Sequence, residues 1–282
     1  LMIRRPPRST LDRSSAASDV YKRQVKHMHT FRITGGEPLL SKHTQRVIDY
    51  LIEHPQPNLK FAINGNGCPP KDLWKVFTKS IKKLEDSNAI REFCLYTSAE
   101  STGPQAEYSR FGMDWNLFTD NIEYFARNTT SKISFMCAFN IYSLTTFKAF
   151  LIWVLYLKSN YFGKHKGNQR ILIDIPYVRN PGFLDVKIAN EQVIEDYLKP
   201  ALKFMQQNTD LHGFKQIETV KLERIVSDVE HRLSNKDNFL KEQKEAQKMF
   251  YMFTKQYDKR RNVEFNKVFP EYTKFLEICK NV

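Results

Sequence analysis

Closely spaced cysteines are missing from this 282-residue sequence. Its four cysteines are Cys68, Cys94, Cys137 and Cys279, and the nearest two, Cys68 and Cys94, are 26 positions apart (94 − 68). This spacing excludes a C-x-x-C pair and the short cysteine motifs that bind metals. Cys94 and Cys137 lie in apolar runs, where a reduced cysteine behaves as a small hydrophobe. The seven histidines show no ligand spacing either. We therefore expect no metal site built from this chain's own residues and a reducing, cytoplasmic setting.

Long apolar runs are missing as well. No run reaches the roughly 18 apolar residues that would indicate a membrane-spanning helix. The nearest candidate, residues 147–157 (FKAFLIWVLYL), is about half that length and contains Lys148. It predicts a buried helix and no association with a membrane.

Positive charge is in excess but is not concentrated. The chain has 44 basic and 31 acidic residues, a net charge of +13. Such an excess favours a polyanionic partner when it gathers on one face. Here six basic and two acidic residues fall within positions 1–24, and the other lysines are scattered over helical segments. Nucleic-acid binding is therefore unsupported, and a basic nucleotide- or RNA-binding α/β protein remains an alternative.

Residues 1–24, LMIRRPPRSTLDRSSAASDVYKRQ, have no helical or strand periodicity and are rich in Arg and Ser. A transit peptide and a basic disordered arm are two interpretations. The string most closely resembles translated sequencing-adapter read-through. We therefore expect a non-native, disordered segment, and a natural protein that is truncated upstream of Val25.

From residue 25 onward, strand-like and helix-like segments alternate. Apolar runs predict strands at 31–34, 60–66, 91–99, 131–142 and 168–178. Helical spacing of apolar residues predicts helices at 43–54, 70–84 and 114–128, and the most apolar helix is predicted at 145–160. This alternation is typical of βαβ units and a parallel sheet. We expect a core at 25–180, followed at 181–282 by a helical region with helices at 191–207, 213–233 and 240–257 and one terminal helix.

Polar residues follow the ends of the predicted strands. They are Thr34 to Glu37, Asn64, Asn66, Ser98, Glu100, Asn140 and the Pro176-Tyr177 pair. The carboxyl ends of parallel strands share one edge, where ligands bind in such folds. Gly35 and Gly36 permit a close backbone approach to a ligand, and Glu37 could bind an ammonium group.

The stretch Gly35-Gly36-Glu37-Pro38 after a strand resembles the radical S-adenosylmethionine (radical SAM) enzymes, in particular members with a twitch-type C-terminal region. In that family this loop binds the amino group of S-adenosylmethionine. Two further segments resemble the twitch-type members, DIPYVRNPGFLDVKI at 174–188 and RRNVEFNKVFPEY at 260–272. The resemblance covers about residues 30–275. It implies an incomplete (βα)6 partial barrel that lacks its first βα unit and carries a helical C-terminal extension.

The resemblance also assigns cofactor-binding residues. A Ser-x-Asp-x motif of the family corresponds to Ser98 and Glu100, and a His-Asp-x-x-Arg motif ends at Arg110. Ser98 and Arg110 would bind the cofactor's carboxylate, with Glu100 near the ribose. Ala106 replaces the histidine of the second motif. Asn64 and Asn140 match polar residues at strand ends that also reach the cofactor.

The family's [4Fe–4S] cluster is held by a C-x3-C-x2-C loop after the first strand, and this sequence has no such loop. With the cluster, these enzymes reductively cleave S-adenosylmethionine to a 5′-deoxyadenosyl radical that abstracts hydrogen from a substrate. The resemblance thus implies S-adenosylmethionine and a cluster in the full-length protein, with a flavodoxin- or ferredoxin-like electron donor. We expect the chain as given to be an inactive fragment with an unknown substrate. A cluster-free binding or scaffold protein of the same fold remains an alternative.

Overall fold

Five parallel strands, hydrogen-bonded in the order β1-β2-β3-β4-β5, form the sheet on which the chain is organised. The strands are β1 (Thr30–Ile33), β2 (Gln56–Gly65), β3 (Ile90–Thr97), β4 (Lys132–Met136) and β5 (Ile171–Asp174). The register pairs Ile33 with Ile63, Ile63 with Leu95 and Leu95 with Ile133. The carboxyl ends of all five strands therefore lie at the same edge.

The structure is a computed structural model that describes residue 25, residues 27–162 and residues 169–282. The adapter-like segment predicted at residues 1–24 lies outside the described residues. All five predicted strands are present, so the α/β class with a parallel sheet is confirmed. The boundary that we predict between residues 180 and 181 remains a prediction.

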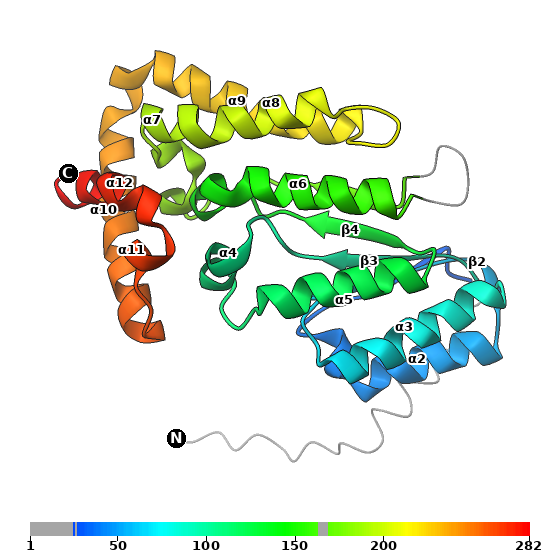
Figure 1. Ribbon diagram of the computed structural model, residues 1–282. Helices are drawn as coiled ribbons and strands as arrows, with labels where there is room; N and C mark the ends of the chain where they lie inside the picture. The colour runs from blue at the N-terminus through cyan, green and yellow to red at the C-terminus, as the bar shows by residue number, and fades with distance from the viewer. Residues whose placement is uncertain (1–24, 26, 163–168) are drawn as a thin grey trace, which may run out of the picture.

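The helices between the strands lie on one face of the sheet, in front of it in Figure 1. They are α2 (Lys42–Glu53), α3 (Lys71–Asp86), α5 (Trp115–Asn128) and α6 (Leu144–Asn160), while the short helix α4 (Gly103–Ser109) lies beyond the carboxyl ends of the strands. A right-handed crossover between strands in sequential order puts every connecting helix on the same face. The short helix α4 was not among the predicted elements.

An aromatic core fills the space between the sheet and these helices. Phe93 of β3, Phe77 of α3 and Phe125 of α5 are all 3% exposed or less. The rings of Phe77 and Phe125 stack with centroids 5.8 Å apart. Trp74 lies beside them, and its indole N–H donates to Asn121 O at 2.6 Å. Burying one such side chain contributes roughly 2–3 kcal/mol, so this cluster fixes the helices on the sheet.

Helix α6 is the most apolar helix of the core. With the preceding turn it forms Ile141–Asn160, the one helix among the described residues that is long and apolar enough to cross a membrane. In this structure, 56% of its most apolar stretch is buried within the protein. Phe147, Leu151 and Val154 on its inner side are completely buried, while Ile152 is half exposed. The predicted helix is thus confirmed, with one side buried.

The opposite face of the sheet is polar between β1 and β4. Lys60, Glu92 and Lys132 lie side by side there, on neighbouring strands β2, β3 and β4. Glu92 pairs with both lysines, and these three side chains are 30–48% exposed. The contrast with the aromatic face follows from the alternation of side chains along each strand.

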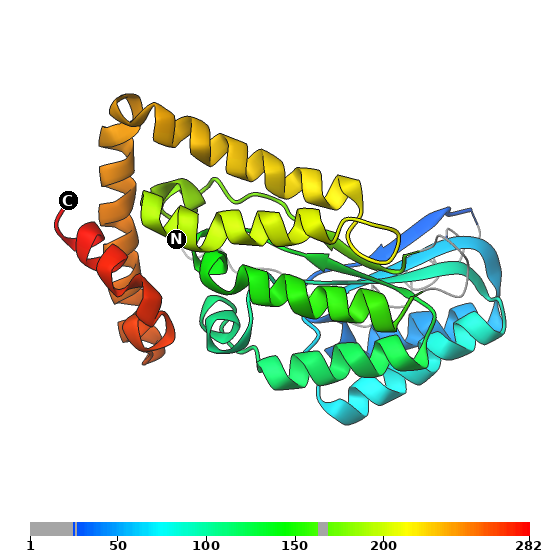
Figure 2. The same ribbon diagram turned by 45° about the horizontal axis from the view of Figure 1, so that its top comes forward.

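The C-terminal region is helical, as predicted, and packs at the β5 end of the sheet and beyond it (Figures 1 and 2). Its main helices are α8 (Lys199–Gln207), α9 (Gln216–Ser234) and α10 (Lys236–Arg261), and α7 (Glu191–Val193) with a π-helical turn at Ile194–Leu198 leads into α8. The prediction of one terminal helix is wrong. The segment divides into α11 (Phe265–Val268), a 3-10 turn (Pro270–Tyr272) and α12 (Thr273–Lys280). Pro270 has no N–H and disfavours a helical conformation at Phe269, so the helix is interrupted there.

The C-terminal helices hold α4 in place. The Tyr108 hydroxyl of α4 donates to Asp258 Oδ1 of α10 at 2.9 Å, and the Tyr257 hydroxyl donates to Tyr108 O at 2.7 Å. Gln105 Nε2 donates to Val268 O at 2.7 Å. The Tyr108 ring also contacts the rings of Tyr257 of α10, Phe265 of α11 and Phe269, which directly follows α11. The position of α4, and of Arg110 directly after it, therefore depends on the far end of the chain.

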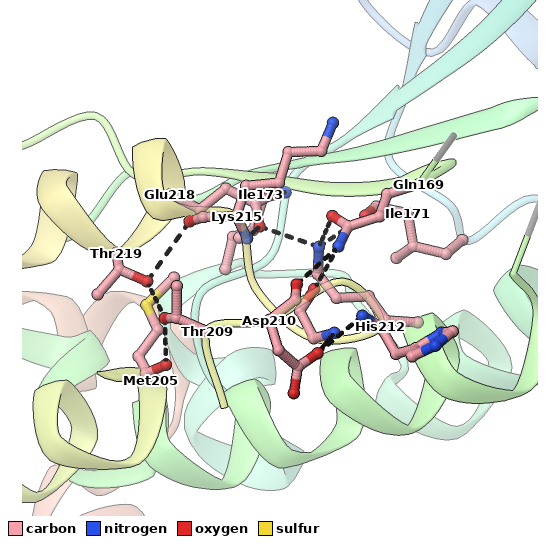
Figure 3. Close-up of polar contacts among 12 residues, drawn as sticks. Gln169, Ile171, Ile173, Met205, Thr209, Asp210, His212, Lys215, Glu218 and Thr219 are labelled. Carbon is pink, nitrogen blue, oxygen red and sulfur yellow. Dashed lines mark hydrogen bonds and ion pairs between the residues drawn. The ribbon is translucent and has the colours of Figure 1, made fainter. Parts of the chain in front are cut away.

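A buried polar network joins α6, β5 and α9. Lys158 Nζ donates to Glu218 Oε2 and Ile171 O, both at 2.9 Å, and to Gln169 Oε1 at 3.4 Å. Glu218 also accepts the backbone N–H groups of Ile173 and Lys215 at 2.9 and 2.8 Å. Figure 3 shows Gln169 pointing into the 209–215 loop, whose carbonyl groups accept its amide hydrogens. Every polar atom of this ion pair is hydrogen-bonded.

Candidate ligand-binding site

A cavity of about 480 Å³ opens at the carboxyl ends of β1 to β4. Residues from five separate segments line it: Thr34, Gly35, Gly36, Asn64, Gly65, Asn66, Cys68, Tyr96, Ser98, Ser109, Arg110, Phe111, Gly112, Met113 and Met136. This volume lies within the range of small-molecule sites, about 300–1,000 Å³. Five of the nine predicted binding residues contribute to the lining, namely Gly35, Gly36, Asn64, Ser98 and Arg110.

Gly35 and Gly36 form the wall next to β1. Both have positive φ angles, 96° and 55°, which side-chain-bearing residues rarely adopt. A Cβ atom added to either glycine would meet nothing within 4 Å. The glycines are therefore required by the backbone conformation, and they leave the main chain open to a ligand in the cavity.

The Glu37 carboxylate is turned toward the backbone. Its Oε2 accepts the N–H of Asn66 at 2.6 Å, and its Oε1 accepts the N–H of Leu39 at 3.2 Å. A Cβ at Gly65 would lie 3.1 Å from Oε1, so the carboxylate passes very close to β2. Glu37 thus joins the loop after β1 to the loop after β2. Pro38 is buried at the start of the following 3-10 turn, and neither residue lines the cavity.

The loop after β2 is fixed by local contacts. Asn66 Oδ1 accepts the N–H of Cys68 at 2.8 Å. At Gly67, which has a φ of 74°, an added Cβ would lie 2.6 Å from the Phe118 ring. Only glycine fits this position, because both the conformation and the space exclude a side chain. The loop presents Cys68 to the cavity, and burial raises the pKa of its thiol, which disfavours the reactive thiolate.

Glu100 and Arg110 form an ion pair, and Arg110 lines the cavity. Arg110 Nη2 donates to Glu100 Oε2, and the Glu100 side chain is only 3% exposed. Burial raises the pKa of Glu100, while the Arg110 charge opposes this shift. Among the described residues, the buried Nε of Arg110 has no hydrogen-bond partner. Arg110 thus lines the cavity while Glu100 compensates part of its charge, and its Nε–H donor has no acceptor among the described residues.

Asn140 does not line the cavity. Its Oδ1 accepts the N–H of Tyr142 at 2.9 Å, and its Nδ2 donates to Ala138 O at 2.7 Å. It begins the 3-10 turn Ile141–Ser143 that leads into α6. The structure therefore places Asn140 as a backbone cap, four residues after β4 ends at Met136.

Several cavity residues were not predicted from the sequence. Tyr96 of β3 and Met136 of β4 lie on the face of the sheet opposite the helices. Phe111 and Met113 come from the loop between α4 and α5. Tyr96 is two positions before Ser98, so strand alternation would have indicated it. The loop residues gave no such signal, because their position depends on where α4 is held.

No group of three or more His, Cys, Asp or Glu side chains within 25, 27–162 and 169–282 could hold a metal ion. The four cysteines are unpaired and lie apart. Cys68 alone among them reaches the cavity lining. Burial raises the pKa of Cys94 to about 11 and that of Cys279 to about 12, and it also raises that of the fully buried Cys137. The raised pKa values keep these thiols protonated near neutral pH.

Comparisons with protein-family models, with curated proteins and with solved structures each gave no match.

Proposed function

We propose that the cavity binds S-adenosylmethionine and that the chain is part of a radical SAM enzyme. The observation that carries this proposal is the convergence of Gly35, Gly36, Asn64, Ser98 and Arg110 on one cavity. In the same proposal, the five-stranded sheet corresponds to five βα units of a (βα)6 partial barrel. The sequential strand order and the helices on one face support that assignment.

The cavity's chemistry fits this ligand. The open main chain at Gly35 and Gly36 suits an ammonium group, which backbone carbonyl groups can accept. Ser98 and Arg110 suit the carboxylate, as a hydroxyl donor and a guanidinium. Met113, Met136 and Tyr96 offer an apolar wall for an adenine ring. Bound S-adenosylmethionine would supply a sulfonium carbon for group transfer or radical chemistry.

The described residues do not fit a [4Fe–4S] cluster, since Cys68 is the single cysteine of the cavity lining. The proposal for this chain is therefore limited to binding and orienting S-adenosylmethionine. The same cysteine placement favours a second candidate, a cluster-free protein that binds a small ligand at this cavity. Iron and sulfide analysis after anaerobic reconstitution addresses the cluster: we expect less than one cluster per chain, and a stoichiometric cluster with bound S-adenosylmethionine would contradict us.

Isothermal titration calorimetry with S-adenosylmethionine tests the binding proposal. We expect one ligand per chain and at least tenfold weaker binding in Ser98→Ala combined with Gly36→Ala, because both the hydroxyl and the open backbone are changed. Ser87→Ala is the matched control, because Ser87 is exposed at the end of α3 and precedes the amino end of β3, opposite the edge where the cavity opens. The proposal fails if the folded wild-type chain gives no heat of binding at millimolar ligand.

A further inference from the structure

Arg32 is held at the edge of the cavity on the polar face of the sheet. It lies on β1 and is exposed, and its Nε donates to Asn64 Oδ1 at 2.6 Å. Its guanidinium carbon is 3.9 Å from the centroid of the Tyr96 ring. Asn64 and Tyr96 both line the cavity, so the hydrogen bond and the ring contact fix the guanidinium next to it.

These two contacts use only part of the guanidinium. Nε is bonded to Asn64, while the two terminal nitrogens of Arg32 have no acceptor in the part of the chain that the structure describes. A guanidinium presents its donors as a planar fork that matches a carboxylate or a phosphate in geometry and charge. Arg32 is therefore pre-oriented and still able to bind an anion.

The surroundings of Arg32 are positive. On the same face, Lys60 Nζ lies 3.5 Å from Glu92 Oε1, and Lys132 Nζ contacts Glu92 Oε2. Arg32 and the two lysines give three positive charges against the single negative charge of Glu92, a net of +2 for these four residues. Such a patch beside a cavity raises the local concentration of small anions.

We propose that Arg32 binds the carboxylate or phosphate of a second small ligand that lies on this face, next to the cavity. The face is adjacent to the proposed S-adenosylmethionine site, so the second ligand is the substrate if the proposed function holds. The proposal thereby assigns the substrate to the class of anionic small molecules. It rests on the proposed function only in calling this ligand a substrate.

Titrations of the full chain with inorganic phosphate and with succinate, at constant ionic strength, test the anion site by NMR. The Nε–Hε resonance of Arg32 is identified by its absence from Arg32→Gln, and the backbone amide of Tyr96 reports affinity in the variants. We expect a saturable shift of both signals and at least tenfold weaker anion binding in Arg32→Gln. Arg46→Gln, the same change at an exposed position of α2, should bind the anion as the wild type does.

The two titrations distinguish a phosphorylated ligand from a carboxylate ligand. A response to phosphate alone indicates a phosphorylated ligand, and a response to succinate alone indicates a carboxylate. A response to both indicates a site that binds either kind of anion. No saturable response, or equal affinity in Arg32→Gln and the wild type, overturns the proposal.

A parallel titration with S-adenosylmethionine separates the two proposals. If Arg32→Gln loses that ligand as much as the anion, Arg32 belongs to the S-adenosylmethionine site and the second ligand is refuted. If the wild type binds the anion but not S-adenosylmethionine, the proposed function falls and the anion site stands.

Discussion

Two ion pairs in this molecule have a buried carboxylate and differ in how completely their atoms are hydrogen-bonded. Lys158 and Glu218, near the amino end of β5, use all their donors and acceptors on each other, on backbone groups and on the Gln169 side chain. Glu100 and Arg110, at the opposite end of the sheet, leave the buried Nε of Arg110 without a partner among the described residues. The first pair is sealed within the fold, and the second borders a cavity.

This difference indicates which buried charges serve the fold and which can serve a ligand. A buried ion pair is costly to desolvate and stable only when its remaining hydrogen-bonding groups are satisfied. The Lys158 network meets that condition without any ligand. The Arg110 pair meets it only in part, and the Arg110 side chain, which is 28% exposed, lines the cavity where a ligand can contact it.

Breaking the sealed pair should have the largest effect. Lys158→Met leaves the Glu218 carboxylate buried without its counter-charge, and we expect a loss of about 3–5 kcal/mol in unfolding free energy by urea denaturation. Lys158→Met combined with Glu218→Gln should recover part of the loss, because the uncompensated charge is gone. If the double variant is less stable than the single one, the carboxylate is not the source of the cost.

Breaking the open pair should cost less and should depend on pH. Arg110→Met removes the charge that opposes burial, so the pKa of Glu100 rises further above its unfolded value. A folded pKa above the unfolded one gives a contribution that is present below the unfolded pKa and is lost as the pH rises. We expect Arg110→Met to lose roughly 2 kcal/mol at pH 8 and clearly less at pH 5, relative to the wild type at each pH. An equal loss at both pH values would show that Glu100 stays ionised.

Glu37 tests how firmly the cavity loops are joined. Glu37→Ala removes the acceptor for two backbone N–H groups, Leu39 and Asn66, and should lower stability by about 1.5 kcal/mol and weaken S-adenosylmethionine binding. Glu53→Ala, at the exposed last position of α2, is the matched control and should change neither quantity. Unchanged ligand affinity in Glu37→Ala would mean that the cavity keeps its shape without this link.

The ion pairs of Glu92 with Lys60 and Lys132 are partly exposed, so they provide a comparison for the Lys158–Glu218 and Glu100–Arg110 pairs. The Lys132 hydrogen bond, and the charge of Lys60 with it, lowers the pKa of Glu92. A lowered folded pKa stabilises the protein above the unfolded pKa, and this is lost as the pH falls through the folded one. Glu92→Gln should cost less than about 1 kcal/mol at pH 7, and the difference from the wild type should shrink below about pH 4. A loss as large as that of Lys158→Met would remove the contrast between exposed and buried pairs.

The sequence predicted the sheet and its helices well, because residues that are buried on one face recur at regular intervals along the sequence. Most apolar residues of α2, α3 and α5 recur at helical spacing and are buried, and so are most of those in the uniformly apolar α6, whereas Val76 and Ile152 are about half exposed. The short helix α4 has no such stripe, and its position comes from Tyr108 contacts with distant residues. Pro270 was visible in the sequence, yet its effect on the terminal helix was missed.

The candidate site was predictable only by position along the strands. Polar residues after β1, β2 and β3 do meet at one cavity, as parallel strands require. Which of them turn toward it depends on local backbone donors. Glu37 and Asn140 both bind nearby backbone N–H groups, and a sequence pattern does not distinguish such caps from ligand-binding side chains.

The attachment of α4 to the C-terminal helices affects the order in which the parts of this protein can fold. Tyr108 bonds to Asp258, 150 positions later, and Gln105 bonds to Val268, 163 positions later. Contacts across such separations form late, and the N-terminal part of a chain folds first during synthesis. The sheet can thus be assembled on the ribosome while Arg110 still lacks its final position. The cavity becomes competent for a ligand only when the last helices have emerged, which delays function until the whole chain has been made.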